Sequence, residues 1–184
     1  MLSKQITSAL TKYYDWWTEQ SDQKVYGFTF YSTSLLEYGG CTVFTEEGLE
    51  QVTAKYQEMD YYRDTPIDQL KEDLRWSPCD APNHMTNEEI FSEVCESLED
   101  VSSRLYELEG DDFEQEVEKA YGAVIQGILG FRAERIPLDR DDVLVTMLWG
   151  DISPREIAHF IKACNSEAAA DKYIQELKLE ETEA

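Results

Sequence analysis

Apolar residues recur every three or four positions along much of the chain, which is the spacing that places them on one side of a helix. The segments with this spacing are residues 2–22, 45–56, 66–74, 86–108, 113–136, 153–161 and 167–179. Three other segments are short runs rich in β-branched and aromatic residues, a composition that favours strands. They are residues 25–31, 41–44 and 143–149. The chain is therefore expected to fold from helices and strands together.

Several of these helices begin or end at residues that suit a helix terminus. Thr45 precedes two glutamates, so its hydroxyl can cap free backbone amides while the carboxylates lie at the positive end of the helix dipole. Ser153 and Pro154 give the order of a capping residue followed by a proline. Gly110 predicts the end of the helix over 86–108.

The strands and helices together predict the fold class. The glycine pair Gly39–Gly40 ends the turn between the first two strands, which favours an antiparallel pair. Residues 77–85 contain two prolines and are expected to form a loop. Because 184 residues fit one domain, we expect a single α+β domain over residues 1–179. It would contain a three- to four-stranded, largely antiparallel sheet packed with several helices, followed by a frayed acidic tail over 180–184.

The charge of the chain is strongly negative. There are 39 acidic residues against 16 lysines and arginines, which gives a net charge of −23. A surface of this sign repels phosphate groups, so we expect no direct binding to nucleic acid or to an anionic membrane. No apolar run is long enough to span a bilayer, and the first 20 residues lack the pattern of a signal peptide. The four cysteines are widely and irregularly spaced, which favours free thiols and a cytoplasmic location.

Residue patterns that carry catalysis or hold cofactors are missing from the sequence. The two histidines, His84 and His159, are far apart, and no cysteine or histidine pair has the spacing of a metal site. Neither a glycine-rich phosphate-binding motif nor a nucleophile motif occurs. Carboxylates are so numerous that pairs suited to glycoside hydrolysis arise by chance. We therefore predict no catalytic residue, cofactor or metal, and an enzyme with an unrecognised carboxylate site is kept as an alternative.

Acidic residues are concentrated in one part of the chain. Residues 86–118 contain thirteen acids and one base, Arg104, which is about half of the excess negative charge. Several of these acids share one helix side, although like charges at that spacing cost about 0.2–0.5 kcal/mol per pair. The residues predicted to contact a partner are Glu88, Glu89, Glu93, Glu96, Asp100, Glu107, Asp111 and Asp112. Such a surface either docks a basic protein or only keeps the chain soluble.

Aromatic residues cluster over 13–17 and 56–76. Most of them are expected in the core or at its edge. Neighbours in a helix point about 100° apart, so one member of Tyr13–Tyr14 and one of Trp16–Trp17 is expected to be partly exposed, as an interface anchor is.

Four pieces of the sequence resemble a known family. They are the strand at 25–31, the stretch Cys41-Thr42-Val43-Phe44-Thr45-Glu46-Glu47-Gly48-Leu49, the stretch Leu74-Arg75-Trp76-Ser77-Pro78, and the strand with the short helix after it from Val143 to Phe160. From about Leu2 to Asn165 the chain resembles the bacterial domain of unknown function 4303 family. The most specific part of the match is the motif Arg75, Trp76, Ser77 and Pro78.

The resemblance implies a cytoplasmic, immunity-type binding protein from a bacterial toxin–immunity neighbourhood, and it transfers no catalytic residue. Within the motif, Trp76 and Pro78 are expected to hold the middle loop on the sheet rather than to contact a ligand.

The leading hypothesis is a cytoplasmic protein that neutralises a cognate bacterial toxin by occluding it. The toxin would present a basic surface, such as the substrate cleft of a nuclease, to the acidic helices. An acidic adaptor, a regulatory domain or a nucleic-acid mimic is the alternative, and the identity of the partner separates these classes.

Overall fold

The computed structural model of the chain describes residues 1–148, 150 and 153–179. Its centre is a four-stranded sheet with the strand order β3-β2-β1-β4. The strands are β1 (Val25–Ser32), β2 (Gly39–Thr45), β3 (Asn83–His84) and β4 (Leu144–Leu148). The β1–β2 and β2–β3 pairs are antiparallel, while β4 runs parallel to β1. The chain is thus a single α+β domain with a mostly antiparallel sheet, as the sequence predicts.

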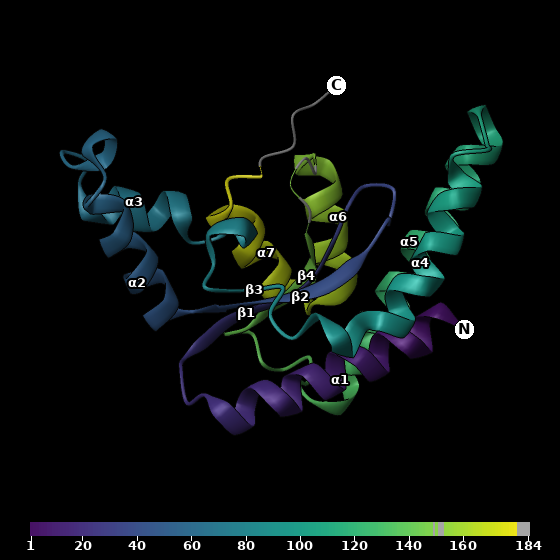
Figure 1. The fold of residues 1–184 in the computed structure, drawn as a ribbon, viewed down its shortest axis with the longest axis horizontal. Coiled ribbons are helices and arrows are strands. Elements are labelled where there is room, and N and C mark those ends of the chain that lie inside the picture. The colour runs from purple at the N-terminus through teal and green to yellow at the C-terminus, as the bar shows by residue number, and fades with distance from the viewer. Residues whose placement is uncertain (149, 151–152, 180–184) are drawn as a thin grey trace.

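Helices surround this sheet in the described part of the chain. They are α1 (Leu2–Gln20), α2 (Glu46–Gln57), α3 (Ile67–Leu74), α4 (Ser92–Leu105), α5 (Gly110–Glu134), α6 (Pro154–Cys164) and α7 (Glu167–Glu176). Three short 3-10 helices are η1 (Asp60–Tyr62), η2 (Pro78–Asp80) and η3 (Glu88–Phe91). Figure 1 shows α2 and α3 at one end of the long axis, α4 and α5 at the other, and α1 along one side of the sheet.

One face of the sheet packs against α1, α4 and α5. Phe28 and Phe30 of β1 lie on this face, because alternate residues of a strand point to the same side. They join buried residues such as Tyr13 of α1, Leu98 of α4 and Phe131 of α5 in the main core. The rings of Phe28 and Phe131 stack with their centroids 4.8 Å apart. This core fixes α4 and α5 relative to the sheet.

The opposite face packs against α2, α3 and α7, while α6 contributes residues to the cores on both faces. Tyr26 of β1 joins Leu49 of α2 and Leu70 of α3 in a second core. Leu144 of β4 joins Tyr173 of α7 in a third. Because helices cover both faces, every residue of β2 and β4 is buried.

The two predicted helix caps are confirmed. At the start of α2, Thr45 Oγ1 accepts a hydrogen bond from the backbone N–H of Gly48 at 3.0 Å. At the start of α6, Ser153 Oγ accepts from the backbone N–H of Glu156 at 3.2 Å, and the Glu156 carboxylate accepts from the Ser153 N–H at 3.1 Å. These bonds satisfy amides that have no partner in the first turn of a helix.

Residues 86–108, which the sequence predicts as one helix, form the short helix η3 and then α4. Asn87 adopts a left-handed conformation with φ of 53°, so η3 forms after it and α4 begins only at Ser92. Helix α4 ends at Leu105. Gly110, with φ of +58°, is the first residue of α5 rather than the end of the preceding helix. A glycine tolerates this φ without steric cost, so it suits a turn on either side of a helix boundary.

β4 lies at one edge of the sheet, and a side chain occupies its free backbone groups. Asn165 accepts a hydrogen bond from the Val145 N–H at 3.1 Å and donates one to the Val145 carbonyl at 2.8 Å. The buried Arg132 of α5 holds this amide by donating to Asn165 Oδ1 at 2.6 Å, and burial lowers the pKa of Arg132. Because free strand edges can pair with other chains, this contact protects the edge of β4 at Val145.

All four cysteines of the chain are free thiols. Cys41 and Cys164 are buried, and burial raises the pKa of Cys164 to about 12, whereas Cys79 is exposed. Within the described residues, no helix combines the length and the apolar character that a membrane span needs. Trp149, at the end of the predicted third strand, and the predicted tail over 180–184 lie outside the described residues.

Candidate partner-binding surface

Helices α4 and α5 form a hairpin at one end of the molecule (Figure 1). The inner side of α4 carries Val94, Leu98, Val101 and Leu105, which are buried in the main core. Their spacing leaves the other side of the helix to solvent. The first fully buried residue of α5 is Ala120, while Phe113 and Val117 in its N-terminal turns are partly buried against the main core. Core packing thus presents the outer side of the hairpin, with its acidic residues, to solvent.

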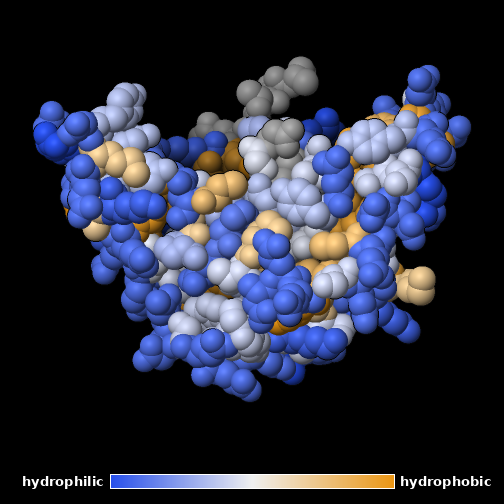
Figure 2. Space-filling model, viewed as in Figure 1, coloured by the Kyte–Doolittle hydropathy of each residue, from blue (hydrophilic) through white to orange (hydrophobic). Residues whose placement is uncertain are grey.

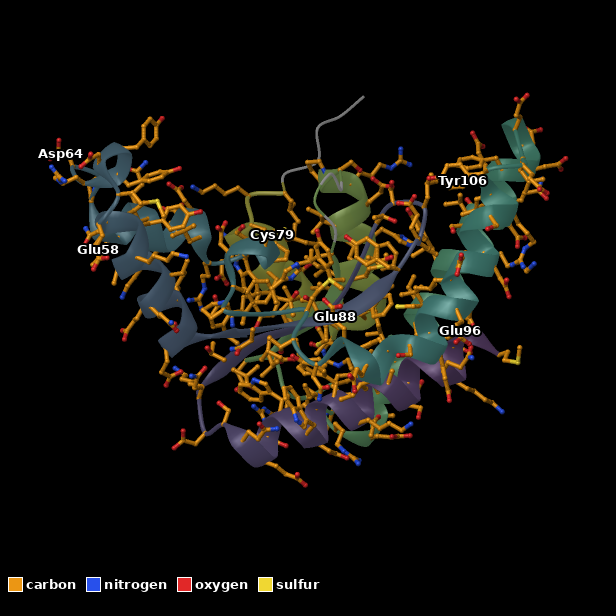
Figure 3. The ribbon with its side chains drawn as sticks, in the orientation of Figure 1. Glu58, Asp64, Cys79, Glu88, Glu96 and Tyr106 are labelled. Atoms are coloured by element: carbon orange, nitrogen blue, oxygen red, sulfur yellow. The ribbon has the colours of Figure 1, made fainter. Side chains whose placement is uncertain are left out.

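The eight carboxylates predicted to contact a partner are all exposed. Their positions follow chain order: η3 holds Glu88 and Glu89, α4 holds Glu93, Glu96 and Asp100, and the turn with the first residues of α5 holds Glu107, Asp111 and Asp112. Glu89 therefore precedes α4 instead of continuing its acidic side. Figure 3 labels Glu88 near the middle of the molecule and Glu96 toward the hairpin. The structure places all eight on η3 and the hairpin rather than scattering them over the molecule.

The bases near these acids neutralise a different carboxylate. Arg104 Nη2 lies 3.4 Å from Glu116 Oε1, and Lys119 Nζ lies 3.0 Å from Glu116 Oε2. The hydrogen bond from Lys119 lowers the pKa of Glu116. Among the described residues, no base forms an ion pair with any of the eight carboxylates. Their negative charge therefore remains available to another molecule.

Helix electrostatics accounts for some of the eight acids. Glu93 lies in the first turn of α4, and Asp111 and Asp112 lie in the first turn of α5. A carboxylate in that position is stabilised by about 0.3–1 kcal/mol through the helix dipole. Glu96 and Asp100 lie further along α4, four residues apart, where like charges repel. The charges of Glu96 and Asp100 therefore lower the stability of α4 rather than raise it.

An exposed tyrosine lies where α4 ends. The Tyr106 hydroxyl donates to Glu37 Oε1 at 2.6 Å, and this bond raises the pKa of Tyr106. The Tyr121 hydroxyl of α5 donates to the carbonyl of Ser34 at 2.8 Å. The loop between β1 and β2 is therefore bound to both segments of the hairpin. Figure 3 shows Tyr106 at the hairpin end of the molecule.

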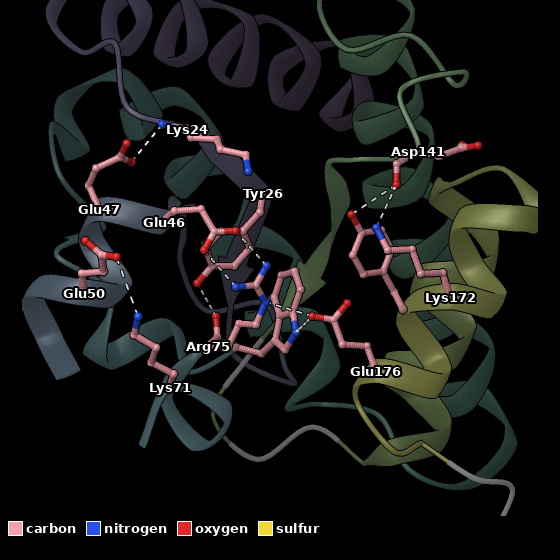
Figure 4. A network of polar contacts seen from close by, with 12 residues as sticks. Lys24, Tyr26, Glu46, Glu47, Glu50, Lys71, Arg75, Asp141, Lys172 and Glu176 are labelled. Carbon is pink, nitrogen blue, oxygen red and sulfur yellow. Dashed lines mark hydrogen bonds and ion pairs between the residues drawn. The ribbon is translucent and has the colours of Figure 1, made fainter. Parts of the chain in front are cut away.

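Arg75 organises a polar network at the other side of the molecule (Figure 4). Its guanidinium donates to both carboxylate oxygens of Glu46, at 3.2 and 3.1 Å, and to Glu176 Oε1 at 2.9 Å. It lies 4.0 Å from the centroid of the Tyr26 ring, whose hydroxyl donates to the Arg75 carbonyl at 2.7 Å. The hydrogen bonds from Arg75 lower the pKa of Glu46. Arg75 thus joins α2, β1 and α7 at the end of α3.

Trp76 packs within the same network. Its ring meets those of Tyr26 and Tyr173 edge-on, with centroids 5.1 and 5.6 Å away. Gly27 of β1 makes room for it, since a Cβ at that position would lie 2.9 Å from the indole. Pro78 then begins η2. The motif lies against the sheet and α7, which is the geometry expected of residues that hold the middle loop in place.

Comparison with known proteins gives one match. Residues 2–166 match the family described as Domain of unknown function (DUF4303). The chain belongs to this family. Searches of curated proteins and of solved structures found no match.

In this DUF4303 domain, one of the two histidines considered for catalysis makes a contact within the fold. His84 Nδ1 forms a hydrogen bond with Thr42 Oγ1 at 2.8 Å, and burial lowers the pKa of His84. His84 belongs to β3, which forms within the segment predicted as a loop. A groove beside α1 contains a single carboxylate, Glu134, which accepts a hydrogen bond from Thr11 at 3.0 Å. The described residues contain no group of three or more His, Cys, Asp or Glu placed to hold a metal ion.

One member of each predicted aromatic pair is partly exposed, as expected, because Tyr13 and Trp17 are buried while Tyr14 and Trp16 are not. Tyr14 and Trp16 are half-buried against the main core, whereas Tyr61 is 86% exposed and Tyr106 is 64% exposed. Tyr61 belongs to the aromatic cluster over 56–76, most of which is expected at the core or its edge. The local apolar spacing contains a signal for Tyr106, because it falls between the apolar positions at Leu105 and 108 and therefore points away from them.

Proposed function

We propose that this DUF4303 domain is a cytoplasmic, immunity-type binding protein that neutralises a cognate bacterial toxin by occluding its basic surface. The proposal assigns no catalytic residue, cofactor or metal to the chain. It joins the acidic surface on η3 and the α4–α5 hairpin with the immunity role that the family resemblance implies.

The observation that carries the proposal is the group of exposed carboxylates without an internal ion pair. All eight lie on η3 and the hairpin, while Arg104 and Lys119 are used by Glu116. Charges of one sign gathered on one surface steer an oppositely charged protein toward it and raise its association rate. They also repel acidic competitors, which gives selectivity without deep shape complementarity.

Occlusion in this proposal requires no chemistry on either partner. The carboxylates would pair with lysines and arginines that line the toxin's active surface, so the toxin's own substrate could not reach them. A nuclease is a suitable target, because the residues that bind its phosphate backbone are basic. The core behind α4 holds Glu93, Glu96 and Asp100 on a rigid helix, which lowers the entropy lost on binding.

A co-purification experiment tests this proposal. The tagged chain is incubated with lysate of its native host at about 50 mM salt, and bound proteins are eluted with increasing salt. We expect one basic protein to be retained at low salt and released as salt rises. That protein should arrest growth when it is expressed alone and lose this effect when it is co-expressed with the chain.

Other outcomes separate the alternatives. Retention of a basic cellular protein that has no toxic effect would favour an acidic adaptor or a nucleic-acid mimic. If no basic protein is retained, or if retention does not depend on salt, the proposed electrostatic binding is wrong.

A further inference from the structure

Several of the exposed apolar side chains lie at one or the other end of the long axis of the molecule. Among the described residues, seven large apolar side chains are exposed. Met59, Tyr61 and Ile67 belong to the end formed by α2, η1 and α3, and Tyr106 belongs to the hairpin end. Tyr38 lies in the loop between β1 and β2, next to the Glu37 that binds Tyr106. Figure 2 shows hydrophobic residues in separate patches on a mostly hydrophilic face.

Tyr61 is exposed and nevertheless held in place. Its ring packs edge-on against Tyr62 with centroids 4.8 Å apart, and Tyr62 packs against Tyr56 at 5.0 Å. The Tyr56 hydroxyl donates to Asp80 Oδ1 at 2.5 Å. A chain of contacts therefore connects the exposed ring to η2. An aromatic ring that is already ordered loses little conformational entropy when a partner covers it.

Tyr106 is held in a comparable way at the other end. Its hydroxyl is bound by Glu37, while 64% of the residue remains open to solvent. The loop that carries Glu37 is itself bound to α5 through Tyr121 and Ser34. Both ends of the molecule thus present an exposed tyrosine that contacts a neighbouring side chain.

Each of these tyrosines has exposed carboxylates close by in the chain. Glu58 and Asp64 flank η1, and Glu107 follows Tyr106 directly. Figure 3 shows Glu58 and Asp64 at one end of the molecule and Tyr106 at the other. Both ends therefore combine an open aromatic ring with exposed carboxylates, although at the η1 end one acid, Asp60, is paired with Arg63.

We propose that one basic protein contacts both ends of this chain, with Tyr61 and Tyr106 as its two anchors. The inference rests on the proposed function and adds a second contact region, α2–η1–α3, which the concentration of acids over 86–118 did not indicate. Arginine and lysine side chains of the partner would pack on the two rings and pair with the neighbouring carboxylates.

Charge favours a basic partner over the other possible occupants. A second copy of this chain would also carry a net charge of −23, so two acidic surfaces would repel one another. An acidic or purely apolar partner would leave the carboxylates unpaired in the interface, which is costly. Tyrosine is enriched among the residues that dominate binding energy, and arginine is enriched among their partners.

Photo-crosslinking in the native host tests the two-ended contact. A photo-reactive phenylalanine is placed at position 61, 106 or 138 of the full chain, one position per strain. The control position is Leu138, which is 50% exposed and lies in the segment between α5 and β4. This segment begins next to Arg135, which is bound to Asp15 of α1 rather than to η1 or to the end of α4. We expect the same basic protein to be attached at 61 and at 106, and not at 138.

Every other crosslinking pattern overturns the inference. If 106 crosslinks a basic protein and 61 does not, the proposed function stands and the two-ended contact is wrong. Different proteins at 61 and 106, a second copy of this chain at either position, or equal attachment at 138 would each exclude a single bridging partner. If no position crosslinks a basic protein, the proposed function fails as well.

Binding measurements with the crosslinked partner, once purified, distinguish anchors from neighbouring contacts. Tyr61→Ala and Tyr106→Ala should each raise Kd at least about tenfold, whereas Leu138→Ala should change it less than about twofold. Tyr106→Phe keeps the ring and loses the bond to Glu37, so it should have a smaller effect than Tyr106→Ala. If Tyr61→Ala leaves Kd unchanged while the charge of α4 matters, the second anchor is rejected.

Discussion

Arg75 shows how one side chain can connect distant parts of this sequence. Its guanidinium binds Glu46, 29 residues earlier, and Glu176, 101 residues later. The three charged groups lie close to Tyr26 and Trp76, so water screens them less than it screens a surface ion pair. The network therefore contributes to the stability of the fold.

The pH dependence of stability should reveal the bond between Arg75 and Glu46. The pKa of Glu46 is lowered below its ordinary value of 4.5 by the bonds from Arg75. A lowered pKa in the folded state stabilises the protein above that ordinary value, and the stabilisation is lost as pH falls through the folded pKa. Glu46→Gln should therefore reduce the free energy of unfolding by about 1–2 kcal/mol at pH 7, and the difference should shrink below about pH 4.5.

Urea unfolding at several pH values measures this difference. Glu50→Gln on the same helix is the control, because Glu50 is exposed and lies 3.7 Å from Lys71 in a weak pair. It should change stability by less than about 0.5 kcal/mol. An equal loss for both variants, or a loss for Glu46→Gln that does not depend on pH, would contradict the role given to Arg75.

At the scale of single residues, sequence reasoning identified the motif but not its partners. Arg75 and Trp76 were singled out by their resemblance to a family pattern. Neither Glu46 nor Glu176 could be assigned to Arg75, since such pairing depends on how α2 and α7 pack on the sheet. Gly27 likewise carries no signal for the indole that covers it.

Helix α4 has a composition that lowers its own stability. Glu96 lies three residues from both Glu93 and Glu99, and four residues from Asp100, so it has three acidic neighbours on the helix surface. Each such pair destabilises a helix by about 0.2–0.5 kcal/mol. An element that keeps this repulsion while its one base, Arg104, pairs with Glu116 of α5 is expected to serve another molecule.

Removing the charge of Glu96 should therefore stabilise the free protein. Glu96→Gln relieves three repulsive pairs and should raise the free energy of unfolding by about 0.5–1 kcal/mol at low salt. Thermal unfolding at about 10 mM and 1 M salt measures the effect, and the gain should disappear at high salt because the charges are screened. A loss of stability at low salt would show that Glu96 has a stabilising partner.

At the scale of elements, local signals predicted most helices and strands, and long-range contacts decided the rest. Thr45 and Ser153 cap their helices as predicted, because capping depends on residues within one turn. The break at Asn87 was missed, since Met85 and Asn87 adopt positive φ where the chain passes from β3 to α4. β3 itself has only two residues and is defined by its pairing with β2, which no local pattern reveals.

For the whole molecule, the sequence predicted a concentration of charge but not the arrangement of the two ends. The acids over 86–118 are visible in the sequence, and the structure keeps them on η3 and one hairpin. The second end, which carries Tyr61, has no such signal. The position of this end relative to the hairpin depends on how α2, α3, α4 and α5 pack around the central sheet (Figure 1).

The central claim is that the acidic side of α4 directs association with a basic protein. The most direct measurement is the association rate constant with the basic protein retained from native lysate, for two variants of equal charge. One variant is Glu93→Lys with Glu96→Lys and Asp100→Lys. The other reverses three exposed acids elsewhere, Glu19→Lys with Asp22→Lys and Asp171→Lys. Each variant changes the net charge by the same amount.

We expect reversal on α4 to slow association at least about tenfold at low salt, and reversal elsewhere to have a much smaller effect. The difference between the two variants should decrease as salt is added. If both variants slow association equally, only the total charge matters, and if neither does, the acidic side of α4 has no part in binding; either result would contradict the account.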